Sequence, residues 1–307
     1  MSIFGYREDT THGPVQLDRY DSSRPHEGKV LAVVQAHADD LPLMSGGLVA
    51  KLVDEGYAAY LIQTTNDEKC GPTPSIGDTI RRNEEDVAQL VDVLGIRAAF
   101  NLGYRNHRLD EASPLELRCR LIFLFRYLQV DTVITFNPWG DVEENPDHYV
   151  TGRAAEAACW MAGTGKDYPE QVQAGIKPHS VADKYYWTMR PGQPYNLVTD
   201  IGTHLEQKIA SMSANKAQGP AGSQGRRLRA RLAAEGRKLS LLGDDDETAD
   251  REYIRHFGLE EYRRMGQPYG MEYAEYHYYV PRGGYAVHTG LQERLERYIA
   301  EHAEPLD

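Results

Sequence analysis

The chain has 307 residues, of which 41% are hydrophobic and 26% charged, enough for one large α/β domain with a substantial core. Its formal net charge of −12 argues against a protein that binds nucleic acid across its whole surface. The 3 cysteines are scattered and form no Cys-x-x-Cys pair, which argues against a disulfide framework and against a thiolate metal site.

The N-terminal region, residues 1–28, is polar and contains Pro14, Pro25 and Gly28, so we expect an irregular leader. It lacks the basic start and apolar block of a signal peptide. No segment of the chain reaches the roughly 20 consecutive apolar residues of a membrane span. We therefore expect a cytoplasmic protein that does not span a membrane.

Strand-like and helix-like segments alternate from residue 29 onward. The predicted strands cover residues 29–36, 57–65, 98–103 and 130–138. The predicted helices that follow them cover residues 46–56, 77–95, 114–129 and 147–162. This alternation predicts a Rossmann-like three-layer α/β/α fold with a mostly parallel sheet, in which ligands bind outside the carboxyl ends of the strands.

Beyond about residue 165 the alternation is less regular. We expect strands at 184–190 and 195–201 and a helix at 202–218. A basic segment, GRRLRARLAAEGRKLS, and an acidic one, GDDDETADREY, then follow and can neutralise each other, before a tail rich in tyrosine. We divide the chain into the leader (1–28), a main domain (29–220) and a helical, tyrosine-rich C-terminal extension (221–307) that packs on the same domain.

Two polar motifs follow predicted strands that end at the same edge of the sheet. The first, AHADDLPLMSGG, contains His37, Asp39 and Asp40, and the second, NPDH, contains His148. Each has an ordinary explanation as a helix start, because Asp and Asn are favoured helix caps. Together they offer two histidines and a carboxylate, and catalytic zinc typically has three protein ligands and one open position. The remaining acid, Asp39, could then reach a bound water as a general base.

These motifs resemble those of the PIG-L/LmbE zinc-dependent N-deacetylases, which include N-acetylglucosaminyl-phosphatidylinositol deacetylase and the deacetylases of mycothiol and bacillithiol biosynthesis. The family's AHPDDE followed by Gly-Gly is similar to AHADDLPLMSGG, and its HPDH is similar to NPDH. Weaker matches are TTNDEKCG, RRNEEDVAQLVDVLG, NLGYRNHRL, KIASMSANKAQ and YAEYHYY. The resemblance covers roughly residues 30–220 and implies that the domain at 29–220 is a metal hydrolase.

The resemblance also implies roles for individual residues. One zinc ion per chain would be held by His37, Asp40 and His148, and Asp39 would be the general base. Asp147 corresponds to an acid near the site that orients a ligand, a role that partners of metal ligands often have.

Three amides stand where relatives have titratable groups. Asn145 replaces a histidine that helps to stabilise the tetrahedral intermediate in relatives, and asparagine can donate a hydrogen bond to an oxyanion but cannot deliver a proton. Asn106 replaces an acid that holds a sugar hydroxyl, and Asn215 replaces a late histidine. Arg81 matches an arginine that contacts substrate. We therefore list Asp39 and Asn145 as catalytic, and Arg81 and Asn106 as substrate-binding.

The implied activity is hydrolysis of an N-acyl group, in the first instance acetyl, from an N-acetylated amino sugar or a related small amide. Two alternatives stay open: a catalytically altered relative that only binds its ligand, which the three amides would suit, and an amidase for another small-molecule conjugate. A dinucleotide site is not expected, because G-x-G-x-x-G is absent and Gly46 and Gly47 are better explained by close packing. The sequence is compatible with a homo-oligomer and does not identify the substrate.

Overall fold

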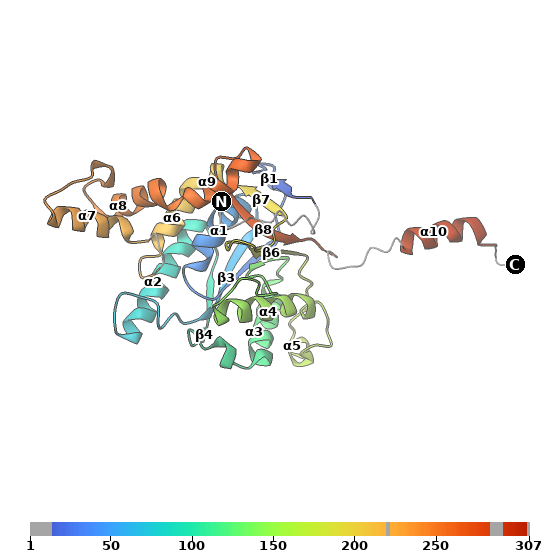
Figure 1. Cartoon of the computed structure of the whole chain (residues 1–307). Helices are drawn as coiled ribbons and strands as arrows, with labels where there is room; N and C mark the ends of the chain where they lie inside the picture. The colour runs from blue at the N-terminus through green and yellow to red at the C-terminus, as the bar shows by residue number, and fades with distance from the viewer. Residues whose placement is uncertain (1–13, 219–221, 283–290, 306–307) are drawn as a thin grey trace.

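The computed structural model describes residues 14–218, 222–282 and 291–305, and its centre is a sheet of 8 strands in the order β1-β7-β8-β6-β5-β2-β3-β4 (Figure 1). The strands are β1 (Gln16–Asp18), β2 (Val30–Gln35), β3 (Ala58–Thr65), β4 (Ala99–Tyr104), β5 (Thr132–Thr135), β6 (Asp183–Trp187), β7 (Leu197–Asp200) and β8 (Ala274–Val280). Within the described part of the chain, every strand pairs in parallel except β8, which is antiparallel to β6 and β7. The predicted fold, an α/β protein with a mostly parallel sheet, is confirmed.

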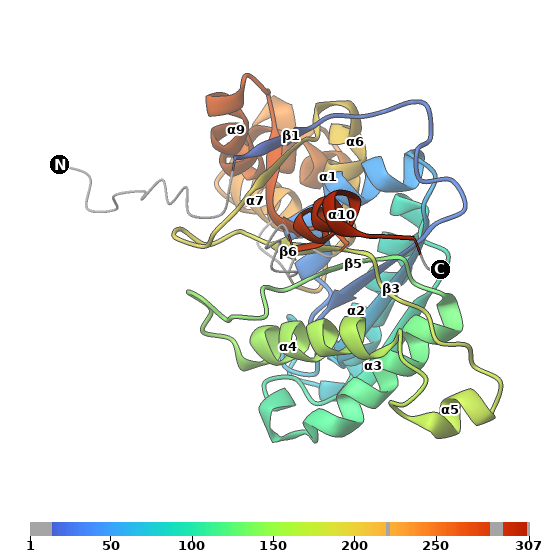
Figure 2. The same ribbon diagram turned by 90° about the vertical axis from the view of Figure 1, so that its right-hand side faces the viewer.

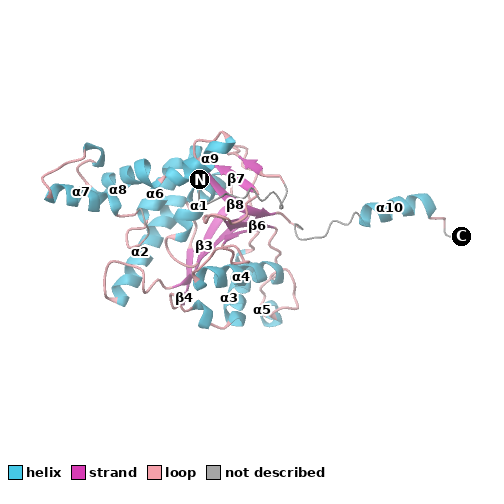
Figure 3. Ribbon diagram, in the orientation of Figure 1, coloured by secondary structure: helices cyan, strands magenta, loops and turns pink. Residues whose placement is uncertain are grey.

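Helices cover both faces of this sheet, as Figures 1 and 3 show. The described α-helices are α1 (Asp40–Asp54), α2 (Ile76–Leu94), α3 (Pro114–Leu128), α4 (Pro146–Met161), α5 (Pro169–Gln173), α6 (Leu205–Ala214), α7 (Gln224–Ala234), α8 (Asp246–Tyr253), α9 (Glu260–Gly266) and α10 (Leu291–His302). Helices α1, α2 and α6 lie on one face, and α3, α4 and α5 on the other (Figure 2).

The two faces of the central strand β2 belong to two separate cores. Leu31 and Val33 pack with α1 and α2, whereas Ala32 and Val34 pack with α3 and α4. This division follows from the alternation of side chains along a strand, and a strand buried on both faces is apolar throughout. The apolar run at 30–34 is therefore explained by its place in the middle of the sheet.

Some boundaries differ from the prediction. The first long helix begins at Asp40 rather than at residue 46, because the motif after β2 forms a helical turn of its own, with Pro42 in the first turn where a missing N–H is tolerated. The leader is not irregular throughout, because Gln16–Asp18 form an edge strand on β7. The helix expected at 202–218 is shorter: residues 202–204 form a 3₁₀ turn, and α6 ends at residue 214.

The C-terminal extension contributes a strand to the middle of the sheet. Strand β8, which contains all of the YAEYHYY motif except its first residue, lies between β6 and β7. Within the same extension the predicted charge neutralisation is confirmed, because Arg226 of α7 pairs with Asp250 of α8 at 2.6 Å and Arg229 pairs with Asp246. The division into three segments stays a prediction. No helix among the described residues is long and apolar enough to cross a membrane.

Candidate active site

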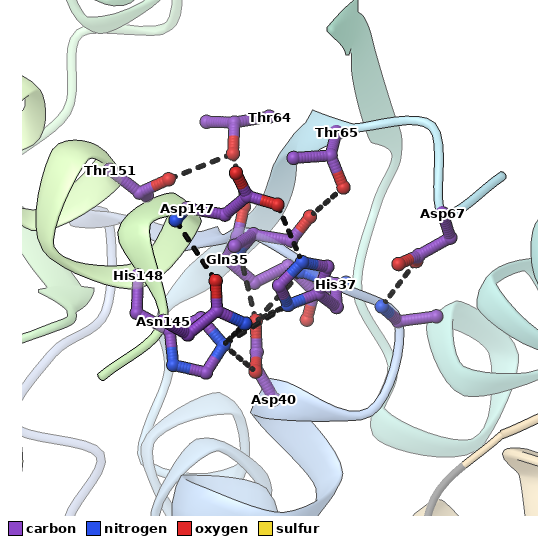
Figure 4. A network of polar contacts seen from close by, with 12 residues as sticks. Gln35, His37, Asp40, Thr64, Thr65, Asp67, Asn145, Asp147, His148 and Thr151 are labelled. Atoms are coloured by element: carbon purple, nitrogen blue, oxygen red, sulfur yellow. Dashed lines mark hydrogen bonds and ion pairs between the residues drawn. The ribbon is translucent and has the colours of Figure 1, made fainter. Parts of the chain in front are cut away.

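The candidate site lies where the strand order of the sheet changes direction. From β2 the chain proceeds through β3 to β4 on one side, and then returns to place β5 on the other side of β2. The loops that leave β2 and β5 therefore diverge, and a crevice at such a switch point is the usual ligand site of an open α/β sheet. His37 is the second residue after β2, and Asp147 and His148 lie in the first turn of α4, which follows β5 (Figure 4).

Two carboxylates hold the backbone of the loop after β2. Asp40 Oδ2 accepts hydrogen bonds from the N–H groups of Ala36, at 3.0 Å, and His37, at 2.7 Å. Asp67 Oδ2 accepts one from the N–H of Ala38 at 2.7 Å. With Oδ2 of Asp40 used in this way, Oδ1 is directed to the Nε2 atom of His148, 3.4 Å away. The loop is thus fixed by the same side chain that offers an oxygen to the site.

Three buried side chains converge here and could hold a metal ion. One ligand atom from each of His37, Asp40 and His148 lies within 4.8 Å of the others. The closest approach is between His37 Nδ1 and His148 Nε2, at 3.0 Å. The ring of Phe136 stacks on that of His148, with centroids 4.2 Å apart, and holds its plane. The structure therefore brings together the three residues proposed as ligands.

Acidic partners determine which ring nitrogens carry protons. Asp147 Oδ2 lies 3.1 Å from His37 Nε2, and Glu143 Oε2 lies 3.1 Å from His148 Nδ1. A carboxylate can only accept a hydrogen bond, so Asp147 places the proton of a neutral His37 ring on Nε2 and leaves a lone pair on Nδ1. Glu143 is an ion-pair contact of His148 Nδ1 without hydrogen-bond geometry, and its negative charge favours the proton on that nitrogen and the lone pair on Nε2. His37 Nδ1 and His148 Nε2 then face each other with lone pairs at 3.0 Å, an arrangement that requires a shared proton or a cation.

The charge of the site also favours a cation. Burial on its own would lower the pKa of His37, but the hydrogen bond to Asp147 and the nearby carboxylates of Asp40, Asp67 and Asp39 raise it to about 9. The imidazole thus stands in a negative field that a metal ion would neutralise. In a tetrahedral zinc site with bonds of about 2.0–2.2 Å, ligand atoms lie about 3.3–3.5 Å apart. His37 Nδ1 lies 3.0 Å from His148 Nε2, and Asp40 Oδ1 lies 3.4 Å from the same His148 atom, which is close to these separations.

Asp39 occupies the N-cap position of α1, next to Asp40. Its side chain makes no cap hydrogen bond, and the residue is half-buried, unlike its neighbour. Burial and the charge of Asp40 raise the pKa of Asp39 to about 6. Of the two adjacent acids, Asp40 holds the backbone and Asp39 does not. The role of Asp39 as a general base stays a prediction.

The two amides proposed for the site make contacts inside it. Asn145 caps α4, because its Oδ1 accepts a hydrogen bond from the N–H of Asp147 at 3.0 Å, while its Nδ2 lies 3.4 Å from His148 Nε2. Asn106 is fully buried, and its Nδ2 donates to Asp147 Oδ2 at 3.4 Å. This contact gives Asn106 a part in holding Asp147, and its predicted contact with substrate stays a prediction.

Arg81 and Asn215, the other two residues singled out in the sequence, have no contact with the cluster among the described residues. Arg81 is exposed on α2 and pairs with Asp78 and Glu85 of its own helix. Its contact with substrate stays a prediction. Asn215 follows the last residue of α6 and is buried, and neither of its polar side-chain atoms has a hydrogen-bond partner in the described part of the chain.

Two residues that support the site were missed in the sequence. Glu143 contacts His148 and Arg190, and although burial would raise the pKa of Glu143, the contact with His148 and a hydrogen bond from the backbone N–H of Asn145 lower it to about 2. Asp67 is buried, which raises its pKa to about 7. An acid two residues before NPDH was a visible signal for Glu143, whereas nothing in TTNDEKCG distinguished Asp67 from its neighbours.

The chain is similar to known proteins in sequence and in fold. Residues 32–159 match the family described as PIG-L: GlcNAc-PI de-N-acetylase. The predicted resemblance to the PIG-L/LmbE family is confirmed. The chain is also similar to the diacetylchitobiose deacetylase of Thermococcus kodakarensis, with 27% identity over 197 residues that cover 62% of this chain and 71% of that protein.

Several solved structures share the fold of this chain. N,N'-diacetylchitobiose deacetylase from Pyrococcus horikoshii superposes with a TM-score of 0.68 at 21% identity, covering 89% of this chain and 92% of that one. The conserved protein TT1542 from Thermus thermophilus gives 0.57 at 23% identity, covering 81% and 93%. GalB, the 4-carboxy-2-hydroxymuconate hydratase of Pseudomonas putida KT2440, gives 0.60 at 17% identity, covering 83% and 97%. At these identities the likeness establishes the fold alone.

Proposed function

We propose that this protein is a zinc-dependent N-deacetylase that removes an acetyl group from an N-acetylated amino sugar or a related small amide. The observation that carries the proposal is the convergence of His37, Asp40 and His148, with acids on both histidines that leave their lone pairs facing each other. The PIG-L match over residues 32–159 and the similarity to an archaeal diacetylchitobiose deacetylase support an amide in a sugar as the substrate.

The residues present fit one zinc ion per chain. Zinc bound by His37, Asp40 and His148 would supply a Lewis acid and lower the pKa of a water to around 7. The histidines would bind through Nδ1 and Nε2, the two atoms that Asp147 and Glu143 leave unprotonated. Because Asp40 Oδ2 already accepts two backbone hydrogen bonds, Oδ1 is the oxygen available for the ion.

The remaining residues would move the proton and stabilise charge. Asp39, free of cap hydrogen bonds, would accept a proton from the attacking water and return it to the departing amine. The Nδ2 group of Asn145 lies beside the ligand atom of His148 and would donate a hydrogen bond to the carbonyl oxygen as negative charge builds on it. The amide C–N bond breaks, and the products are acetate and a free amine.

The test is metal content followed by amine release. Protein purified without added metal or chelator is analysed for zinc, and amine release is then measured with N,N'-diacetylchitobiose, N-acetylglucosamine and a panel of other N-acyl amides. We expect about one zinc per chain, and release that is lost in Asp39→Ala while zinc stays bound. Asp244→Ala, at a site that is 90% exposed and paired with Lys238, serves as the matched control and should keep full activity.

The same experiment addresses the two alternatives. Zinc without amine release from any substrate favours a ligand-binding relative, which Asn145 and the buried Asn106 would suit because neither can titrate. Release from other amides but not from N-acetyl sugars favours the amidase. A chain that binds no zinc, even after zinc is added, would exclude the proposed mechanism.

A further inference from the structure

Helix α1 is broken within the motif that carries the acids of the site. Ser45 has φ −152° and ψ 25°, which is not helical, so residues 40–44 form a separate turn ahead of the rest of the helix. That turn carries Asp40, and Asp39 precedes it. The orientation of both acids therefore depends on whatever holds the short turn in place, since a single turn has little stability of its own.

A fully buried ion pair lies against this break. Lys208 of α6 and Glu275 of β8 are both 0% exposed, and Lys208 Nζ lies 2.7 Å from Glu275 Oε1. Burial on its own would lower the pKa of Lys208, but the charge of Glu275 raises it above its ordinary value, so the lysine is charged. The two partners are far from each other and from the break in sequence, and neither takes part in the proposed chemistry.

The side chains of Lys208 and Glu275 form hydrogen bonds with the backbone on opposite sides of the break. Lys208 Nζ donates to the carbonyl oxygens of residues 42 and 43, each at 2.8 Å. Glu275 accepts from the N–H groups of residues 47 and 48, at 3.0 and 2.8 Å. A helix end leaves carbonyls unpaired at its C-terminus, which attract cations, and N–H groups unpaired at its N-terminus, which attract anions. The ion pair therefore caps both ends that the break creates.

Aromatic side chains next to the break connect it by contacts to His148. Trp187 Nε1 donates to Ser45 Oγ at 2.8 Å, and the Trp187 ring packs edge-on against Phe136, which stacks on His148. Tyr262 donates to the carbonyl of Leu43 at 2.5 Å, and its ring lies 4.0 Å from Lys208 Nζ.

The two glycines of the motif allow two neighbouring segments to lie close to the break: Gly46 faces α6, and Gly47 faces the residue that follows β7. A Cβ at residue 46 would lie 2.5 Å from Ser211 Oγ, and one at residue 47 would lie 2.6 Å from Ile201 Cγ2. The close packing expected of Gly46 and Gly47 is confirmed, and it brings Lys208 within reach of the backbone.

We propose that Lys208 and Glu275 are positioning residues of the metal site, which hold the turn of Asp39 and Asp40 in register with His148 by capping both sides of the break at Ser45. This inference rests on the proposed function, because it concerns the site where the metal would bind. A buried ion pair is an expensive way to stabilise a fold, since apolar replacements of similar size are often as stable. A role in setting backbone positions explains why charges stand here.

The experiment separates positioning from stability. Lys208→Met leaves Glu275 charged and unpaired, so both stability and zinc affinity should fall. The double variant Lys208→Met/Glu275→Leu removes both charges and should recover much of the stability. Because it restores no caps at the break, its zinc affinity should stay about 10- to 100-fold below that of the unmodified chain, as for other residues that orient metal ligands. Zinc affinity is measured by competition with a chromogenic chelator, and the spectrum of the Co²⁺-loaded protein reports the ligand geometry.

Lys51 supplies the matched control. It is a buried lysine of the same helix beyond the break, paired with Glu55 at 2.9 Å and with Asp18. Lys51→Met should lower stability and leave zinc affinity and the Co²⁺ spectrum unchanged. If Lys208→Met does not fold, Tyr262→Phe removes only one hydrogen bond at the break and should weaken zinc binding by a smaller factor.

The possible results are distinct. The positioning role would be overturned if the double variant binds zinc within twofold of the affinity of the unmodified chain. It would also be overturned if the double variant loses no more zinc affinity than Lys51→Met does. Either result leaves the proposed function intact. An unmodified chain that binds no zinc would overturn both. Recovery of stability without recovery of affinity supports the proposal.

Discussion

Asp147 lies 3.1 Å from the Nε2 atom of His37, the ring nitrogen that does not face the other ligands. The same carboxylate accepts hydrogen bonds from the N–H groups of His107, at 2.6 Å, and Leu109, at 3.1 Å. It therefore fixes the tautomer of His37 while being fixed itself by the loop after β4. Carboxylate–histidine pairs of this kind raise the basicity of a metal ligand and set the orientation of its ring.

Asp147→Asn should weaken zinc binding about 10- to 100-fold. An amide can donate as well as accept, so it no longer forces the proton of His37 onto Nε2, and the ring loses its preference for binding through Nδ1. The dissociation constant for zinc, measured by chelator competition at neutral pH, checks this. Asp131→Asn is the matched control, because Asp131 also lies 3.0 Å from a histidine, His179, at a partly exposed position. Equal losses of affinity in both variants would contradict the assignment.

Asn145 combines a structural and a proposed chemical role, which two substitutions separate. Asn145→Asp keeps the cap on α4, since aspartate also accepts from the N–H of residue 147, but it loses the donor group beside His148. We expect kcat to fall by about 10²- to 10³-fold with a nearly unchanged free energy of unfolding. Asn145→Ala should lose the same activity and about 1 kcal/mol of stability as well. The measurements are amine release at saturating substrate and urea unfolding.

The outcome that would remove Asn145 from the mechanism is unambiguous. If the aspartate variant keeps full kcat, the side chain is only a helix cap. Ser113 offers a comparison, because it is the N-cap of α3 and its Oγ accepts a hydrogen bond from the N–H of Glu116 at 3.4 Å. Ser113→Ala should cost a similar stability without any change in kcat.

Much of this architecture could be predicted because it depends on local patterns. The apolar run before His37, the amphipathic helix that became α2 and the Asn-Pro start of α4 each reflect a few neighbouring residues. Once two strands are known to be parallel, the side chains after their carboxyl ends must lie at one edge. The convergence of His37 with His148 followed from that reasoning.

The rest depended on contacts between residues distant in the chain. Glu275 bonds the N–H of Gly47 across 228 positions, and no periodicity within the motif indicates a break at Ser45. The place of β8 in the middle of the sheet likewise depends on its partners, β6 and β7, rather than on its own sequence. For the same reason Asp67 was missed, because its importance comes from the hydrogen bond that its carboxylate accepts from the N–H of Ala38, a distant residue in the chain.

Removal of the metal should destabilise the protein measurably. Bound zinc at 100 to 1,000 times its dissociation constant stabilises a fold by about 2.7–4 kcal/mol, which disappears when a chelator removes it. We expect the Tm to fall by several degrees in EDTA and to return when excess zinc is added. A variant that lacks a ligand, His37→Ala, should show no response to either addition. An identical Tm with and without chelator in the unmodified chain would count against a structural contribution from the metal.

Acid stability provides a test that requires neither metal nor substrate. His277 of β8 is fully buried, and neither ring nitrogen has a hydrogen-bond partner in the described residues. Burial, together with the positive charge of Lys208, lowers the pKa of His277 to about 3. In the unfolded chain the same histidine has a pKa of about 6.5. Above pH 6.5 both states are neutral at this residue, and it makes no pH-dependent contribution.

As the pH falls below 6.5 the unfolded chain takes up a proton at His277 that the folded protein does not. The free energy of unfolding should therefore decrease by about 1.4 kcal/mol per pH unit from this residue, down to about pH 3. Between pH 7 and pH 5 the loss is about 2 kcal/mol. His277→Leu removes the titrating group, so its stability should fall less steeply over this interval. Urea unfolding of the metal-free proteins at several pH values checks this. The unmodified chain and the variant share every other acid and histidine, so a difference between their pH dependences comes from His277. Parallel curves for the two proteins would show that His277 is protonated in the folded state or is not a source of acid sensitivity.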